Sequence, residues 1–215
     1  MNRFITFEGV EGSGKTTQIK MASSFLRSRG RPCLVTEEPG GTSLGKRIRR
    51  MLLRRSEEGL AAETELLLFA AARAHHVRAL ILPALENDGR KFVLCDRFAD
   101  ATLAYQGFGR GLDRRTIEGM NELACGPLKP ALTLLFDVTP EMGLQRAIGR
   151  MSGESRSVRE DRFENEDVSF HRRVREGYLA LAKEEPGRFR IIDGSRDIGE
   201  VHRQVCTILS DHFGI

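Results

Sequence analysis

The chain has 215 residues, a length that suits one domain with a substantial hydrophobic core. Its hydrophobic content of 40% and charged content of 30% are ordinary for a globular protein and exclude a fibrous or low-complexity chain. The net charge of +4 is small, and phosphate ligands explain it as readily as nucleic acid does. No run approaches about 18 uninterrupted apolar residues, and no apolar signal core is recognisable, so we expect a cytoplasmic protein without a membrane span.

The cysteine and histidine patterns do not indicate a metal site. The four cysteines form no Cys-x-x-Cys pair, so we expect neither a structural disulfide nor a thiolate-bound transition metal. Cys33 and Cys95 lie in apolar, strand-like runs, where a buried reduced thiol is expected. His75 and His76 would point about 100° apart on a helix and could not share a ligand.

Short apolar runs alternate with longer amphipathic ones along the chain. Strands are expected at residues 3–8, 33–36, 91–95, 132–138 and 189–192. Helices are expected at residues 15–28, 43–55, 62–86, 114–124, 140–151, 168–184 and 197–212. This alternation predicts an α/β fold with a five-stranded parallel sheet covered by helices on both faces. Active groups should then gather at the carboxyl ends of the strands.

The first expected strand is followed at once by a complete phosphate-binding loop at residues 9–16, Gly-Val-Glu-Gly-Ser-Gly-Lys-Thr. Its glycines permit a tight curl whose backbone N–H groups converge on phosphate oxygens. Lys15 can reach the terminal phosphates, Thr16 can hold Mg²⁺, and the following helix adds its positive end. A glycine-rich surface turn is the alternative, but the full match between strand and helix favours nucleoside triphosphate binding.

The third expected strand ends in Asp96, which is followed at once by Arg97. Such an aspartate can hold magnesium-bound water, and Arg97 can clamp a second phosphate. This pair fits a kinase with two phosphorylated substrates better than a motor or transporter ATPase. The base-reading Asn-Lys-x-Asp motif of a GTPase is absent from the sequence.

Residues 152–160 break the regular pattern, because they have no apolar face and are dense in serine, glycine and charge. They form either a disordered surface loop or a lid that brings arginines over the triphosphate. Nothing suggests a second domain or an internal repeat. We therefore expect one domain over residues 1–215, with a lid at about 150–162.

Six short motifs follow one another over almost the whole chain. They are Glu-Pro-Gly-Gly-Thr, Asp-Arg-Phe, Ala-Tyr-Gln-Gly, Gly-Arg-Gly, Leu-Phe-Asp-Val and Asp-Arg-Phe-Glu, at residues 38–42, 96–98, 104–107, 109–111, 135–138 and 161–164. Each is weak alone, but together they closely resemble bacterial thymidylate kinases. The resemblance implies a P-loop NTPase-like three-layer sandwich that phosphorylates dTMP to dTDP with MgATP, usually as a homodimer.

The resemblance also implies where ATP and magnesium bind. Thr16 and Asp96 are the implied metal residues. The implied ATP-binding residues are Gly9, Val10, Glu11, Gly12, Ser13, Gly14, Lys15, Thr16, Thr17 and Arg146. The loop Gly194-Ser195-Arg196 is a further candidate for contact with adenine.

Catalysis must come from positioning and charge neutralisation, because the acceptor phosphate is already anionic and needs no strong base. The resemblance implies that an arginine supplies part of the transition-state charge. In one branch of the family a P-loop arginine does this, and in the other the lid does. This P-loop has no arginine, so the lid must supply it. The implied catalytic residues are Lys15, Arg97, Arg150 and Arg162, with Arg156 and Arg159 as alternatives.

The implied thymine pocket combines an aromatic ring with polar groups. Phe69 and Arg73 stand at positions i and i+4 and so face one side of their helix. Gln106 offers a donor and an acceptor to a pyrimidine edge. A core aromatic is the alternative for Phe69, but an unpaired buried Arg73 would be very costly, which argues against a sealed core.

Other implied dTMP contacts involve the phosphate and the sugar. Arg49 and Arg97 match phosphate-binding positions, and Thr102 approaches the base or the phosphate. Tyr105 either excludes a ribose 2′-hydroxyl, which would select deoxyribose, or has only a packing role. The complete implied set is Glu11, Glu38, Arg49, Phe69, Arg73, Arg97, Thr102, Tyr105 and Gln106. In this set Glu11 contacts the sugar 3′-hydroxyl unless it faces solvent, and Glu38 borders the acceptor and the metal's water shell.

The chain departs from the family pattern at Glu37, where an arginine is usual, and at Ala101, where a serine is frequent. Either position 37 faces away from phosphate here, or Lys46 or Arg47 compensates. A kinase for another nucleoside monophosphate, such as dUMP or CMP, is the alternative enzyme. A nucleotide-dependent nucleic-acid binder would need a basic face with stacking aromatics, which 7% aromatic content without Trp does not favour.

Overall fold

The computed structural model describes residues 2–54, 59–87, 89–151, 162–163 and 165–215. Five parallel strands form its sheet in the order β2-β3-β1-β4-β5. They are β1 (Phe4–Glu8), β2 (Cys33–Glu37), β3 (Phe92–Asp96), β4 (Leu132–Asp137) and β5 (Phe189–Asp193). The predicted five-stranded parallel sheet is therefore confirmed, with each strand end within one residue of expectation.

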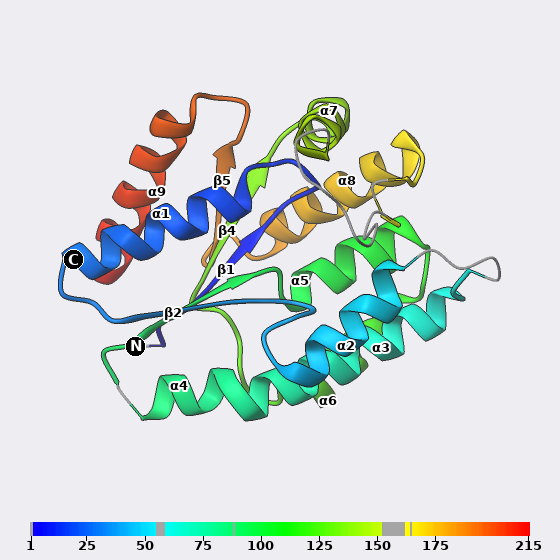
Figure 1. The fold of residues 1–215 in the computed structure, drawn as a ribbon, viewed down its shortest axis with the longest axis horizontal. Helices are drawn as coiled ribbons and strands as arrows, with labels where there is room; N and C mark the ends of the chain where they lie inside the picture. Colours follow the sequence, from blue (N-terminus) through cyan, green and yellow to red (C-terminus); the bar gives the residue numbers. More distant parts are fainter. Residues whose placement is uncertain (1, 55–58, 88, 152–161, 164) are drawn as a thin grey trace.

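Helices cover both faces of this sheet because side chains alternate along each strand. Ile5 and Phe7 of β1 pack into a core with helices α1 (Lys15–Ser28) and α9 (Ile198–Phe213). Phe4 packs on the opposite face against the apolar side chains of Val77 and Ile81. Figure 1 shows α1 and α9 together on one side of the sheet, and the remaining large helices on the other. The three-layer arrangement follows.

The second helical layer is built from consecutive segments between β2 and β5. Its elements are α2 (Ser43–Leu53), α3 (Ala62–His76), the π-helical η1 (Val77–Ile81), α4 (Leu82–Glu86), α5 (Ala99–Thr102), the π-helical η2 (Leu103–Gly109), α6 (Arg114–Cys125), α7 (Pro140–Met151) and α8 (Val168–Glu184). The single helix expected at residues 62–86 is thus continued through a π-helical turn. The pair α5 and η2 was not predicted.

Aspartate and threonine side chains fix the starts of several helices. Thr42 accepts a hydrogen bond from the Gly45 N–H at the start of α2, and Asp167 accepts one from the Phe170 N–H at the start of α8. These contacts satisfy donors that a helix N-terminus leaves open. The α8 cap lies directly after the expected lid, so the chain re-enters a fixed helix there.

All four cysteines are free thiols, in agreement with the absence of a predicted disulfide. Cys95 in the central strand β3 is buried as expected. The expectation for Cys33 is wrong, since this residue is only partly buried. It begins β2, which is an edge strand of the sheet and is covered less completely.

One continuous helical stretch, Ala62–Glu86, is long and apolar enough to cross a membrane by length and composition alone. It contains charged residues that interrupt the apolar run, and two of these, Glu65 and Arg73, are buried inside the protein. A core helix of a globular protein passes the same test, so this stretch is weak evidence for a membrane span.

Candidate active site

A cavity lies at the carboxyl ends of the strands, where the strand order reverses around β1, as expected for an open α/β sheet. One side is formed by residues 11–16 of the phosphate-binding loop. Phe69 and Gln106 line the opposite side, and Arg97 lies in the same cavity. The structure therefore brings together most of the residues that the sequence assigned to two separate ligands.

The phosphate-binding loop is curled tightly against the rest of the protein. Gly9, Gly12 and Gly14 have φ angles of 139°, 69° and 93°, a region that favours glycine. A Cβ on Gly12 would lie 1.9 Å from the carbonyl oxygen of Gly143 in α7. The two backbones touch at this point, so the loop conformation depends on α7 as well as on its own glycines.

Lys15 folds back over the loop that contains it. Its ammonium group donates to the carbonyl oxygens of Gly9 and Val10 at 2.9 and 2.8 Å, and to the Ser13 hydroxyl at 3.2 Å. Burial, reinforced by the Arg97 guanidinium, lowers the pKa of Lys15 to about 8. The lysine is thus held by the loop itself in a position from which phosphate oxygens can replace these acceptors.

Thr16 and Asp96 meet across the cavity floor, with the Thr16 hydroxyl donating to Asp96 Oδ2 at 3.0 Å. No group of three or more His, Cys, Asp or Glu side chains capable of holding a metal occurs in the described part of the chain. One hydroxyl and one carboxylate are oxygen ligands that suit Mg²⁺, which usually completes its octahedron with phosphates and waters. The donor set therefore fits magnesium delivered with a nucleotide.

Arg73 is held by an ion pair at the other end of the cavity. Its Nε donates to Glu38 Oε2 at 2.7 Å, and its two remaining nitrogens donate to Asn121 Oδ1 at 2.6 Å and to the Phe98 carbonyl at 3.0 Å. Arg73 is only 2% exposed. Arg73 is therefore buried, against the expectation from its charge, because Glu38 supplies the counter-ion.

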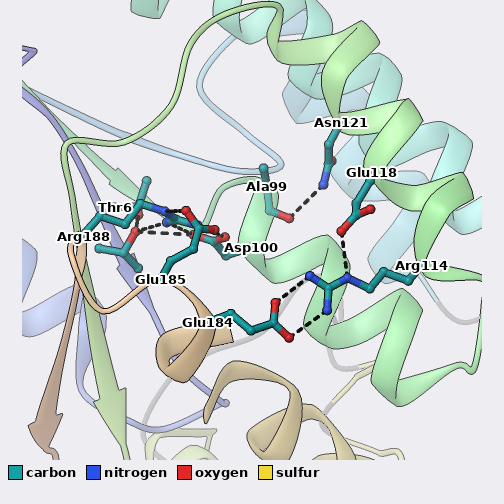
Figure 2. Close-up of polar contacts among 10 residues, drawn as sticks. Thr6, Ala99, Asp100, Arg114, Glu118, Asn121, Glu184, Glu185 and Arg188 are labelled. Carbon is teal, nitrogen blue, oxygen red and sulfur yellow. Dashed lines mark hydrogen bonds and ion pairs between the residues drawn. The ribbon is translucent and has the colours of Figure 1, made fainter. Parts of the chain in front are cut away.

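The partners of Arg73 are themselves fixed. His76 Nδ1 lies 2.8 Å from Glu38 Oε1, and its Nε2 lies 2.7 Å from the Thr36 hydroxyl. Asn121 donates its amide N–H to the Ala99 carbonyl at 3.2 Å, which directs its oxygen to Arg73. Figure 2 shows Asn121 reaching the start of α5 in this way. Neither His76 nor Asn121 was predicted from the sequence.

Gln106 and Phe69 line the cavity beside Arg73. Gln106 donates to the fully buried carboxylate of Glu65 at 2.5 Å, which leaves its carbonyl oxygen for other partners. Arg110 and Arg162 also donate to Glu65. The Phe69 ring lies 6.3 Å from the Phe163 ring, and both border the cavity.

Arg162 lies on the acceptor side of the cavity in this structure. It donates to the Leu52 carbonyl at 2.6 Å as well as to Glu65, and its guanidinium stacks over Phe163 at 4.7 Å. The side chain of Arg150 and the whole of residues 152–161, with Arg156 and Arg159, lie outside the described residues. The lid assignment therefore remains a prediction for these arginines.

Glu11 faces into the protein, not into solvent. It accepts from Arg97 at 2.8 Å and from the Tyr105 hydroxyl at 2.7 and 2.8 Å, and His171 Nδ1 lies 3.4 Å away. Burial opposes ionisation, but Arg97, His171 and Lys15 outweigh it and hold the pKa of Glu11 well below its usual range. Glu11 is an anion throughout the working pH range.

Of the remaining predicted residues, Arg49 and Thr102 line the cavity, whereas Arg146 does not. Arg49 donates to the Pro39 carbonyl at 3.1 Å and lies 3.5 Å from the Glu37 carboxylate, so position 37 faces the acceptor side. Thr102 is 1% exposed, and its hydroxyl has no hydrogen-bond partner among the described residues. Arg146 donates to the carbonyls of Gly194 and Ser195, which joins α7 to the loop after β5.

This cavity combines a phosphate-binding loop with a pocket for a second ligand, and Arg97 lines it together with both. Such an arrangement is typical of kinases that phosphorylate nucleoside monophosphates. The family model described as thymidylate kinase matches residues 7–205. A thymidylate kinase of Syntrophus aciditrophicus is 54% identical over 96% of this chain and 93% of its own length. One of Geotalea uraniireducens is 53% identical, with 95% of each chain covered.

A solved structure supports the same conclusion. The thymidylate kinase of Ehrlichia chaffeensis is 35% identical, with a TM-score of 0.74 over 96% of this chain and 97% of that chain. The chain belongs to the thymidylate kinase family, and the resemblance seen in its six sequence motifs is confirmed.

Proposed function

We propose that this protein transfers the γ-phosphoryl group of MgATP to dTMP and so forms dTDP. The observation that carries the proposal is that one cavity is lined by Lys15 and Thr16 of the phosphate-binding loop together with Phe69, Gln106 and Arg97. A donor and an acceptor bound at its two ends would bring their phosphates together at Arg97. This is the geometry that direct transfer requires.

Catalysis here is a matter of positioning and charge neutralisation, because the acceptor phosphate is already an anion. Lys15 and the loop N–H groups hold the donor phosphates, and Arg97 and Arg49 hold the acceptor phosphate. Arg73 and Gln106 orient the base over Phe69, while Glu11 and Tyr105 close the sugar side. Lid residues at about 150–162 supply further arginine charge, from Arg150, Arg162 or the neighbouring Arg156 and Arg159.

The donor set of Thr16 and Asp96 is assigned to Mg²⁺, which supplies charge neutralisation on the phosphates when bound. We expect Asp96→Asn to raise the magnesium concentration for half-maximal rate by about tenfold or more, because one anionic ligand is lost. A magnesium titration of initial rate at fixed ATP measures this. Asp211→Asn, at an exposed position in α9 that does not line the cavity, is the control and should leave the titration unchanged. Equal curves for both variants would remove Asp96 from the metal site.

Substrate choice is tested by coupled ADP release with dTMP, dUMP, CMP and AMP. The proposal expects the highest kcat/KM for dTMP. The Gln106 amide is held by Glu65 with its oxygen unused, and an oxygen acceptor matches the N3–H of thymine but not the unprotonated N3 of cytosine. A preference for CMP would overturn the pocket assignment.

The wider setting follows from the same family membership. We propose a cytoplasmic homodimer that binds ATP and dTMP and acts on neither nucleic acid nor membranes. Exposed apolar side chains on α2, α3 and α6, namely Met51, Leu67 and Leu123, support helix packing between two copies. Light scattering of the purified protein tests the dimer.

A further inference from the structure

Glu8 is a buried acid that no step above uses. It is the last residue of β1, it stands immediately before the phosphate-binding loop, and it is fully buried. Burial, reinforced by the nearby Asp100 carboxylate, raises the pKa of Glu8. An acid in such a place is costly unless its oxygens are satisfied, so its partners indicate what it does.

The first partner of Glu8 is the backbone beside Arg97. Glu8 Oε1 accepts from the Phe98 N–H at 2.7 Å. Arg97 has a φ of 67°, and no other non-glycine residue in the described ranges has a positive φ. A side chain in this region is unfavourable and persists only where surrounding contacts enforce it. The hydrogen bond to Phe98 fixes the peptide that leaves Arg97 and so enforces this conformation.

The second partner of Glu8 is the hydroxyl of Tyr178 in α8, which donates to Glu8 Oε2 at 2.8 Å. Arg97 in turn donates to the same hydroxyl oxygen at 3.2 Å. A phenol has only one proton, so donating it to Glu8 leaves the oxygen lone pairs for the guanidinium. Tyr178 is 1% exposed and has no room to turn away.

We propose that Glu8 is a positioning residue that fixes Arg97 at both ends, its backbone through the Phe98 N–H and its guanidinium through the Tyr178 hydroxyl. The inference rests on the proposed role of Arg97 in holding the dTMP phosphate. It goes beyond that role, because Glu8 touches neither ligand. A carboxyl group is required, since both partners are donors and the two oxygens of Glu8 each meet one of them, whereas an amide offers only one oxygen.

Glu8→Gln is the decisive variant because it keeps the side-chain volume but offers only one acceptor. Either the Phe98 N–H or the Tyr178 hydroxyl then loses its partner, so Arg97 keeps its bonds to the Gly9 carbonyl and to Glu11 but loses one of the two contacts through which Glu8 positions it. We expect the Kd and KM for dTMP to rise by about ten- to a hundredfold, as for a displaced positioning group, while the KM for ATP stays within about twofold. Tyr178→Phe breaks the same relay from the other side and should shift dTMP binding in the same direction.

Thr6→Val is the matched control. Thr6 lies two residues earlier in the same strand, is fully buried, and bonds the Thr133 hydroxyl at 2.9 Å, not Phe98 or Tyr178. Figure 2 shows it in the polar network around Asp100 and Arg188. This variant should bind dTMP as the unmodified protein does. Thermal melting of all variants checks that each is folded at the assay temperature. If Glu8→Gln is not folded, dTMP binding by Tyr178→Phe tests the inference instead.

The background variant Arg97→Ala separates a positioning role from a merely structural one. If Glu8 acts through Arg97, Glu8→Gln should change dTMP affinity by less than about twofold once Arg97 is gone. An unchanged penalty in that background, or an equal loss of ATP affinity, would overturn the inference. Normal dTMP binding by Glu8→Gln would also overturn the inference if Arg97→Ala binds dTMP weakly. In that case Arg97 would hold dTMP without depending on Glu8. Normal dTMP binding by Arg97→Ala would instead remove both assignments.

Discussion

Gly143→Ala should raise the KM for ATP by at least about tenfold, although Gly143 touches no proposed ligand. An alanine Cβ at this position would lie 2.4 Å from the Glu11 carbonyl oxygen, which belongs to the backbone of the phosphate-binding loop. Backbone cannot yield as a flexible side chain does, so either α7 or the loop must move. The φ of Gly143 is not positive, so the contact, and not backbone strain, is the cause. Initial rates over an ATP series measure the effect.

The same helix supplies the control for this prediction. Gly149 also lies in α7, and a Cβ there would meet no atom of the described residues within 4 Å. Gly149→Ala should leave the KM for ATP unchanged and stabilise the helix by up to about 1 kcal/mol. A normal KM for Gly143→Ala would mean that the loop does not depend on its contact with α7.

The fold was predictable because its signals are local. Each strand is a short run of apolar residues, such as Phe4 to Phe7, and each ends at a polar residue. The phosphate-binding loop follows from spacing alone, and its contacts with Lys15 confirm the expected curl. The helices that begin at Lys15, Pro140 and Val168 have the predicted bounds because their apolar periodicity is uninterrupted.

The supporting residues of the site could not be predicted, because their partners are remote in sequence. Glu8 and Tyr178 are separated by 170 positions, and Arg73 and Asn121 by 48. Glu65 in the first turn of α3 is typical of a solvated acid at a helix start, yet it is fully buried beneath cations. The π-helical η2, which presents Gln106, also has no sequence signal as clear as helical periodicity.

Glu38→Ala should destabilise the protein by about 3–5 kcal/mol, because it leaves the buried Arg73 charge without its counter-ion. His76 also loses its partner at 2.8 Å. Urea unfolding measures the free energy. The pair between Glu141 and Arg172 has a similar distance of 2.5 Å but is exposed, so Glu141→Ala should leave the free energy of unfolding nearly unchanged. If the two variants lost the same free energy of unfolding, burial of the Arg73–Glu38 pair would not make its disruption more costly.

A second substitution separates the structural role of this ion pair from its role in binding. In Glu38→Ala/Arg73→Met the uncompensated charge is gone, so part of the lost stability should return. Binding of dTMP should not return, because Arg73 is the donor proposed to reach the thymine carbonyl. Stability would then partly recover in the double variant while dTMP affinity stays low. If dTMP affinity recovered together with stability, Arg73 would be a structural counter-ion for Glu38 and the base would be recognised elsewhere in the cavity.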